Sequence, residues 1–534
     1  MGMLQLLVKL LNRLEPSKDQ YSRKLNIIEN SIYGVDLEPM AVEISRLRAW
    51  LTLVVDEQNS GTAQPLPNLD FKFVCANSLM HLESVDEYFD FFHDSEGEAK
   101  LADIRHAYFS ATSPSDKNML KEQYLMLAKS SDGEFGSQRS RQLKSFNPFE
   151  FSAAASFFDA ETMFGVSEGF DIVIGNPPYI DYRKIDGETK KAVSNYRVSS
   201  SSKMINLYLY FFELGFNLLS HDGVLAYITP QQYLSYPNAK GLRDLIRART
   251  LVLLADFARA KVFDAATYTF TTIVSARKST DSGRYLEFNQ VNDLTQPIRE
   301  ISVLNPVAEP LNLSPYESIC NDIERAGDCK VGDVSDIFCA SSSTTLEFST
   351  LESSGPKFLA ASDIFEWRIR DISKRVIESS YPSASLRKQQ VQAVYTSRMT
   401  NTIRAAVVEA GEYLGGKVNV LLPKPEVSTY LLAAILNSKV INFWYREKFS
   451  MQHMQGGALP VNTTDLEIIP LPKNLPLWGK LETLSKKATS EQGNLPEIRE
   501  QIDLLVFELF GLSKEVITVI EDRYSQYTVS KQVN

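Results

Sequence analysis

The sequence has few of the residues that hold metal ions. Only 4 cysteines and 5 histidines occur in 534 residues. Cys75, Cys320, Cys329 and Cys339 form no CxxC pair, and no histidine cluster accompanies them. Cysteines scattered in this way are mostly buried small apolar residues, so we expect no metal site. Their low number is typical of a protein of the reducing cytoplasm.

Long hydrophobic runs are also absent. No stretch of 18 apolar residues occurs, so we expect no membrane span and no membrane partner. The N-terminal stretch carries Lys9 and Arg13 and has no small-residue cleavage site, so we expect no signal peptide.

The net charge of −10 does not exclude a polyanionic partner, because such a partner is bound by a local basic face. From Lys357 to Lys448, 14 Lys and Arg stand against 8 Asp and Glu. This excess indicates either such a face or a solvated surface with uneven charge.

What the sequence does contain is a long alternation of strand and helix patterns, which predicts an α/β fold with a doubly wound parallel sheet. A chain of this length needs two or three domains. We expect a first domain over 1–285, with a helical insertion at about 81–160. A linker over 286–315 and an α+β domain over 316–475 would follow, and residues 476–534 read as a helical tail.

Six segments have the composition of strands and three have helical spacing. The apolar run FDIVIG predicts a strand buried on both faces. His221-Asp222-Gly223 predicts a turn. The expected strands are 31–36, 70–76, 170–175, 224–228, 251–257 and 269–276, and the helices are 3–14, 40–54 and 208–219.

The tetrapeptide Asn176-Pro177-Pro178-Tyr179 directly follows the strand FDIVIG. Ligands of open α/β sheets bind beyond the carboxyl ends of the strands. The Asn176 side-chain oxygen and the next backbone carbonyl could accept hydrogen bonds from the exocyclic amine of adenine and localise its lone pair. The prolines would fix both acceptors, and Tyr179 would stack on a base flipped out of its duplex. The alternative is a Pro-Pro turn in which Asn is a turn former.

Four further positions are candidates for contacts with a nucleotide-like cofactor. Asp36 ends a strand, where a carboxylate commonly accepts hydrogen bonds from ribose hydroxyls, and Leu37 follows it. The alternative for Asp36 is a helix N-cap before Pro39. Asn77 and Ser78 follow the strand at 70–76, where Asn77 either contacts an adenine ring or is a loop residue. Phe211 either walls that ring or is plain core.

Together these segments resemble the gamma-class adenine-N6 DNA methyltransferases, most closely the large enzymes of Type IIG restriction-modification systems. The resemblance covers nearly the whole chain. It rests on IYGVDLEPMAVEISRLRAWLTLVVD, GFDIVIGNPPYI, INLYLYFFELGFNLLSHDGVLAYITP and LAAILNSKVINFWYREKF, which begin at residues 32, 169, 205 and 432.

The resemblance implies a Rossmann-like fold, S-adenosylmethionine as the methyl donor, and double-stranded DNA as the substrate. By it Asp36 matches the ribose-binding acid. Asn77 stands where the family usually has Asp, which is a mild departure. Tyr268 and Phe270 are loose matches to a second base-stacking aromatic. The segment over 316–475 becomes a target-recognition domain, with plausible DNA contacts at Arg368, Arg370, Arg387, Lys388, Arg398 and Lys448.

The family's glycine-containing cofactor loop has no counterpart here, because the chain starts with MGMLQLLVKLLNRL, which resembles the helix after that loop. The chain therefore looks N-terminally truncated. We expect either an adenine methyltransferase of a restriction-modification or phage-defence system, or a DNA-specificity fragment whose partner supplies the loop. That partner could be an upstream polypeptide or a restriction endonuclease. Methylation of a protein glutamine or of RNA adenine is a third possibility, which the large downstream domain disfavours.

Overall fold

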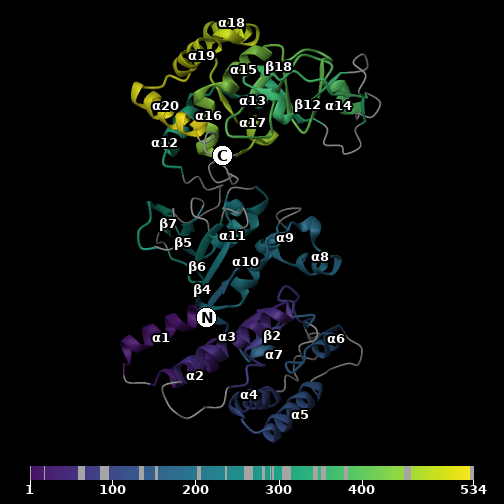
Figure 1. Cartoon of the computed structure of the whole chain (residues 1–534), viewed down its shortest axis with the longest axis vertical. Helices are drawn as coiled ribbons and strands as arrows, with labels where there is room; N and C mark the ends of the chain where they lie inside the picture. The colour runs from purple at the N-terminus through teal and green to yellow at the C-terminus, as the bar shows by residue number, and fades with distance from the viewer. Residues whose placement is uncertain are drawn as a thin grey trace. The chain divides into compact units, whose positions relative to one another are not determined.

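The chain folds into two compact units in the computed structural model (Figure 1). The first comprises Met1–Thr229, Pro237–Ala260 and Thr269–Ala308, and the second comprises Pro230–Tyr236, Lys261–Tyr268 and Glu309–Asn534. The structure describes residues 2–16, 19–57, 67–83, 95–130, 138–150, 154–200, 206–234, 237–257, 262, 269–279, 283–288, 290, 294–303, 314–340, 347–349, 356–377, 383–449 and 459–529.

A six-stranded sheet forms the centre of the first unit, with the strand order β3-β4-β6-β5-β7-β8. The α/β class is confirmed, but the sheet is mixed, because β6 and β8 run antiparallel to β5 and β7. β7 and β8 also extend the sheet into residues that the composition assigns to a linker. The strands are β3 (Phe170–Gly175), β4 (Leu219–Pro230), β5 (Thr250–Asp256), β6 (Thr269–Ser275), β7 (Gly283–Glu287) and β8 (Arg299–Val303).

β3 lies at one edge of this sheet and pairs with β4 in parallel. The prediction that it is buried on both faces is wrong, since Ile172 is 50% exposed and Ile174 is 56% exposed. These two side chains share one face of the strand, and the described residues leave that face uncovered. The register jumps from Phe170↔Leu219 to Ile172↔Val224, so the predicted turn at residues 221–223 is an irregularity within β4.

The N-terminal helices surround a separate two-stranded sheet in the same unit. β1 (Gly34–Asp36) pairs in parallel with β2 (Phe73–Cys75). α1 (Gly2–Leu14), α2 (Gln20–Ser31) and α3 (Pro39–Glu57) pack around one core that includes Leu4, Ile28 and Leu53. The helical spacing of the sequence therefore located α1 and α3 to within a few residues.

The predicted helical insertion contains α4 (Ser95–Ser110), α5 (Pro114–Ser130) and α6 (Gln138–Ser145). An aromatic cluster that includes Phe71, Tyr108 and Tyr124 ties α4 and α5 to the segment before β2. On the other side of the unit, α10 (Tyr208–Asn217) leads into β4, and α11 (Lys240–Arg247) packs on β5.

The second unit contains two four-stranded sheets and a helical layer. One sheet is antiparallel, in the order β10 (Ser335–Cys339), β20 (Asn419–Pro423), β16 (Ala393–Thr396) and β18 (Ala405–Val408). The other is β11 (Phe348–Ser349), β15 (Arg375–Val376), β12 (Lys357–Ala360) and β19 (Tyr413–Gly416).

The helical layer of this unit includes α15 (Thr429–Asn437) and α16 (Lys439–Lys448), which are almost wholly buried. α18 (Leu475–Ser490), α19 (Leu495–Leu509) and α20 (Lys514–Val529) pack on them (Figure 1). The predicted C-terminal helices are thus part of the core of the second unit.

The four cysteines are free, but only Cys75 and Cys320 are buried, whereas Cys329 is half-buried and Cys339 is exposed. The expectation that all four thiols are buried is therefore wrong for Cys329 and Cys339. None of the helices that the structure describes is both long and apolar enough to cross a membrane.

Candidate active site

The tetrapeptide at 176–179 follows β3 at the carboxyl end of the sheet. Gly175 pairs with Tyr227 of β4, and a Cβ at Gly175 would lie 3.0 Å from the Tyr227 ring. A larger residue would therefore require the Tyr227 ring to shift by a few tenths of an ångström. Beyond Gly175, Asn176 and Pro178 are exposed and Pro177 is buried.

The hydroxyl of Tyr179 fixes the Asn176 side chain. It lies 2.7 Å from Asn176 Oδ1 and 3.0 Å from the carbonyl oxygen of Ile228. Burial raises the pKa of Tyr179 to about 12, so the hydroxyl keeps its proton at neutral pH and acts as a donor. A carbonyl oxygen has two lone pairs, so Asn176 Oδ1 keeps the capacity to accept one more hydrogen bond.

The loop is also tied to the start of α10. The Leu207 amide donates to the Ile180 carbonyl at 2.8 Å. The Tyr179 ring meets the Tyr208 ring edge-on, with centroids 6.2 Å apart. These contacts hold the loop over β4 and α10. Ile228 and Tyr208 both lie in the segment that begins at residue 205, but the sequence pattern assigns no supporting role to either of them.

The predicted cofactor residues Asp36, Leu37, Asn77 and Ser78 are brought together at the ends of β1 and β2. Asp36 pairs with Cys75, so both strands end at the same level. Asp36 Oδ1 accepts from the Glu38 amide at 2.9 Å, before α3 begins at Pro39, so this contact is not a cap of that helix. Asn77 Oδ1 accepts from the Leu79 amide at 3.3 Å, which is a contact within its loop. Asp36 remains exposed.

Leu37 is 60% exposed, and Asn77 and Ser78 are half-buried, so this end of the small sheet is open. The carboxylate and amide oxygens suit hydrogen bonds to hydroxyl and amine groups of a nucleoside. Phe211 is half-buried on α10, whose other aromatic residues are buried. No contact that the structure describes joins Phe211 to the ends of β1 and β2.

Of the two candidates for a second base-stacking aromatic, the structure describes only Phe270. Tyr268 lies outside the described residues. Phe270 is fully buried in β6, where it packs 6.3 Å from the Tyr285 ring. Alternation along the strand turns its ring into the core, so Phe270 is corrected to a core residue.

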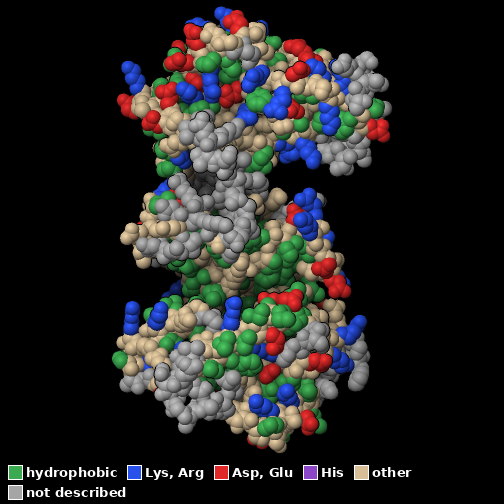
Figure 2. All heavy atoms as spheres, viewed as in Figure 1, with side chains coloured by type: hydrophobic (Ala, Val, Ile, Leu, Met, Phe, Trp, Pro, Cys, Tyr) green, Lys and Arg blue, Asp and Glu red, His purple; other side chains and the backbone are tan. Residues whose placement is uncertain are grey.

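Three of the predicted DNA contacts lie on exposed parts of the second unit. Arg368 belongs to β14 (Arg368–Ile369), Arg370 follows it, and Arg387 lies in the last turn of α14 (Ser383–Lys388); all three are exposed. On the face of this unit seen in Figure 2, Lys and Arg side chains lie among Asp and Glu. The local basic excess of the sequence is therefore not one continuous basic face in this view.

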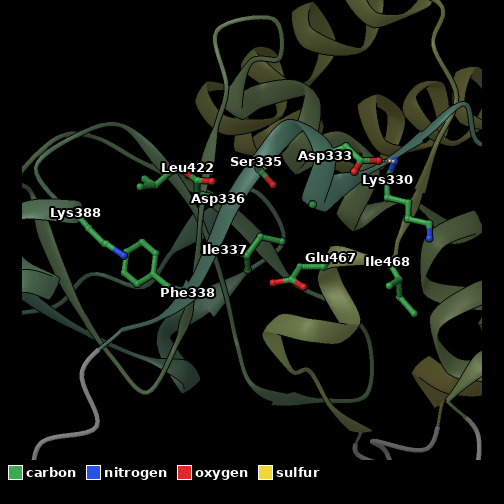
Figure 3. A pocket seen from close by; sticks show the side chains of 11 residues that line it. Lys330, Asp333, Ser335, Asp336, Ile337, Phe338, Lys388, Leu422, Glu467 and Ile468 are labelled. Atoms are coloured by element: carbon green, nitrogen blue, oxygen red, sulfur yellow. Dashed lines mark hydrogen bonds between the residues drawn. The ribbon is translucent and has the colours of Figure 1, made fainter. Parts of the chain in front are cut away.

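The other three predicted contacts have partners within the protein. Lys388 Nζ lies 5.0 Å from the Phe338 ring centroid, beside a hollow of about 580 Å³ along β10 (Figure 3). Arg398 is half-buried and its Nη1 lies 3.4 Å from Cys339 Sγ. Lys448 forms a 2.8 Å ion pair with Glu324. That pair compensates the Lys448 charge, so its contact with DNA stays a prediction.

Known proteins resemble parts of this chain, and one sequence profile covers the tetrapeptide. The sequence profile described as Eco57I restriction-modification methylase matches residues 30–263. A putative type II restriction enzyme and methyltransferase of Methanocaldococcus jannaschii is 39% identical over 82 residues, which are 15% of this chain and 7% of that protein. The Type II methyltransferase M.AccI of Acinetobacter calcoaceticus is 29% identical over 133 residues, 24% of each chain. The matches thus span a small part of these relatives.

Similarity of fold extends further than similarity of sequence. The Type IIL restriction-modification enzyme MmeI, solved in complex with DNA, superposes with a TM-score of 0.52 at 11% identity. The superposition covers 98% of this chain and 77% of MmeI. The chain therefore shares the α/β fold of MmeI, and its residues 30–263 are similar to the Eco57I restriction-modification methylases.

Proposed function

We propose that this chain is a DNA methyltransferase that transfers the methyl group of S-adenosylmethionine to N6 of adenine. The observation that carries the proposal is the position of Asn176. Its side chain is exposed at the carboxyl end of β3, and the Tyr179 hydroxyl holds its oxygen in place. An adenine amine is a donor, so it needs an acceptor of this kind.

The residues of the loop would make the exocyclic amine of adenine more nucleophilic. The lone pair of the exocyclic amine is delocalised into the ring, which makes it a poor nucleophile. Asn176 Oδ1 and the Pro177 carbonyl would accept its two N–H groups and draw the nitrogen toward tetrahedral geometry. Both prolines restrict the backbone, so little reorganisation is needed when the base enters. The N–CH₃ bond would form as the S–CH₃ bond of the methyl donor breaks and its sulfur becomes a neutral thioether, and one amine proton would be released to solvent.

The ends of β1 and β2 fit the nucleoside part of the methyl donor. Asp36 would accept from the ribose hydroxyls, with Leu37 beside it, and Asn77 and Ser78 would meet the adenine ring. Phe211 would wall that ring. When bound, S-adenosylmethionine supplies an electrophilic methyl group. The protein residues only bind and orient it.

DNA as the substrate is supported by the fold shared with MmeI, which was solved with DNA, and by the methylase profile over residues 30–263. A base inside a duplex has its amine paired, so the target adenine must be flipped out to reach Asn176. A second unit as large as the one that follows the tetrapeptide gives room for sequence recognition.

The proposal is tested by transfer of a radiolabelled methyl group to mixed-sequence duplex DNA, followed by nucleoside digestion. We expect N6-methyladenine as the only labelled product. Asn176→Ala should reduce transfer by about 100- to 1,000-fold, because an acceptor at the reacting centre is lost. Asn30→Ala, at an exposed position on α2, is the matched control and should transfer normally. Label on cytosine, or equal transfer by the two variants, would contradict the proposal.

One observation favours the second candidate, a DNA-specificity chain that needs a partner for transfer. Asp36 and Asn77 lie on or next to the β1–β2 sheet. The described strands do not join this sheet to the six-stranded sheet, whose strand β3 directly precedes Asn176. Under this alternative the chain binds DNA alone but transfers methyl groups only with an added polypeptide. The same assay, repeated with any polypeptide encoded directly upstream, separates the two candidates.

A further inference from the structure

Three arginines of the second unit converge on one aromatic ring. The guanidinium carbons of Arg368, Arg370 and Arg404 lie 5.0, 5.6 and 5.6 Å from the centroid of the Phe365 ring. We call these four residues the Phe365 arginine cluster. Arg368 and Arg370 are exposed, and Arg404 and Phe365 are half-buried, so the cluster is open to solvent.

The positive charges of this cluster are not compensated within the described residues. None of the three guanidiniums forms an ion pair with a described carboxylate, although each of the nearby acids has a contact of its own. Glu366 pairs with Arg499 at 2.8 Å. Asp371 lies 3.8 Å from Lys357, and Asp363 accepts from the Ala360 amide. Three like charges around one ring therefore favour an anion from outside.

The hairpin that carries the cluster is fixed by its buried side. β13 (Ile364–Phe365) pairs with β14, and Trp367 between them is fully buried with a positive φ of 56°. Its amide donates to the Ala405 carbonyl at 2.9 Å, and its indole N–H lies 3.1 Å from Ser485 Oγ. The tip is thus anchored to β18 and α18, while Arg368 points away from the core.

The backbone around Arg404 is fixed as well. Asn442 accepts from the Ile403 amide, and Asn437 both accepts from the Ala405 amide at 2.8 Å and donates to its carbonyl at 2.9 Å. Both asparagines are fully buried on α15 and α16. Residues on both sides of Arg404 are therefore held, so its backbone needs no reordering when an anion binds.

We propose that the Phe365 arginine cluster binds the phosphodiester backbone of duplex DNA. The inference rests on the proposed function for the identity of the anion. Guanidiniums form forked hydrogen bonds with phosphate oxygens, and three of them on a fixed backbone match consecutive phosphates better than one base edge. The cluster therefore positions DNA on the second unit without reading its sequence.

The test is the affinity of the full chain for a fluorescent mixed-sequence duplex between 50 and 200 mM salt, measured by anisotropy. Arg368→Ala with Arg370→Ala removes two phosphate contacts. The slope of log affinity against log salt should fall in magnitude by about 1.8, and affinity at low salt should fall at least about tenfold. Arg368→Lys with Arg370→Lys keeps the charges and should keep the slope.

The matched control is Lys480→Ala with Lys487→Ala, which removes the same charge from exposed positions of α18. Its slope should equal that of the unmodified chain. An equal loss in both double variants, or an unchanged slope in the arginine variant, overturns the inference. Loss of binding to one sequence only would make the arginines base readers and would also overturn it.

This readout is independent of methyl transfer. An unmodified chain that binds duplex DNA with the predicted slopes but never methylates it would count against the proposed function alone. An unmodified chain that binds no duplex DNA overturns the inference about the cluster. Thermal unfolding of each double variant within about 2 °C of the unmodified chain excludes misfolding, since both arginines are exposed.

Discussion

The Tyr179 hydroxyl lies 2.7 Å from Oδ1 of Asn176, and 3.0 Å from the Ile228 carbonyl oxygen. A phenol has one proton, so the two acceptors share a single donor. This contact links the exposed amide of the loop to the neighbouring strand β4. It gives Tyr179 a positioning role toward Asn176 in addition to any stacking on a base.

Tyr179→Phe separates these two roles. The ring remains, but the hydroxyl that positions Asn176 is lost. We expect kcat to fall about tenfold, equivalent to one modest hydrogen bond, with little change in KM for DNA. Tyr179→Ala should lower kcat/KM further, because stacking on the base is lost as well. Identical kinetics for the Phe variant and the unmodified chain would show that the hydroxyl does not position Asn176.

Asp503 should make the stability of the second unit pH-dependent. Burial raises its pKa from 3.8 to about 6, although Lys439 lies nearby, with Nζ 3.9 Å from Oδ2. The folded state therefore holds a proton that the unfolded state has lost between pH 4 and 6. The free energy of unfolding should fall as pH rises through this window, by about 3 kcal/mol in total.

Asp503→Asn tests this directly, because the amide oxygen can still accept from the Lys439 amide as Oδ1 does. At pH 8 the variant should be more stable in urea unfolding by about 3 kcal/mol, and at pH 4 the two proteins should agree. The exposed Asp522→Asn serves as control and should change little at either pH. A variant less stable than the unmodified chain at pH 8 would refute the prediction.

Asn437 is expected to be costly to replace. It satisfies both the amide and the carbonyl of Ala405 from a fully buried position. Asn437→Leu has similar size but leaves the Ala405 amide without a partner, so unfolding free energy should fall by about 2–3 kcal/mol. Asn494→Ala, at an exposed helix start with no side-chain cap bond, is the comparison and should cost little.

Lys417 occupies a left-handed backbone conformation, with φ of 56°, in the turn between β19 and β20. The side chain is exposed. Lys417→Gly should therefore stabilise the protein by up to about 1 kcal/mol, since glycine adopts this conformation without strain. Lys417→Val should destabilise it, because a β-branched residue is strained at positive φ. Equal melting temperatures for both variants would contradict the assignment.

The sequence alone determined the local parts of the candidate site. An apolar strand that ends in glycine and is followed by Asn-Pro-Pro-Tyr has few backbone conformations open to it, so the place of Asn176 at the end of β3 followed from residues 170–179. Asp36 and Asn77 were each selected from the sequence for its place at the end of, or just after, a strand; that β1 and β2 pair in parallel and bring the two residues together is shown by the structure.

Tertiary structure decided what depends on partners distant in the chain. The contact of Tyr179 with Ile228 joins residues 49 positions apart, and the Phe365 arginine cluster gathers Arg404 from 39 residues beyond Phe365. The same holds for the burial of Phe270 and the exposure of Ile172, which have equally apolar side chains. Hydropathy gives the tendency of a side chain to be buried, but only the neighbours that the fold supplies decide whether it is covered.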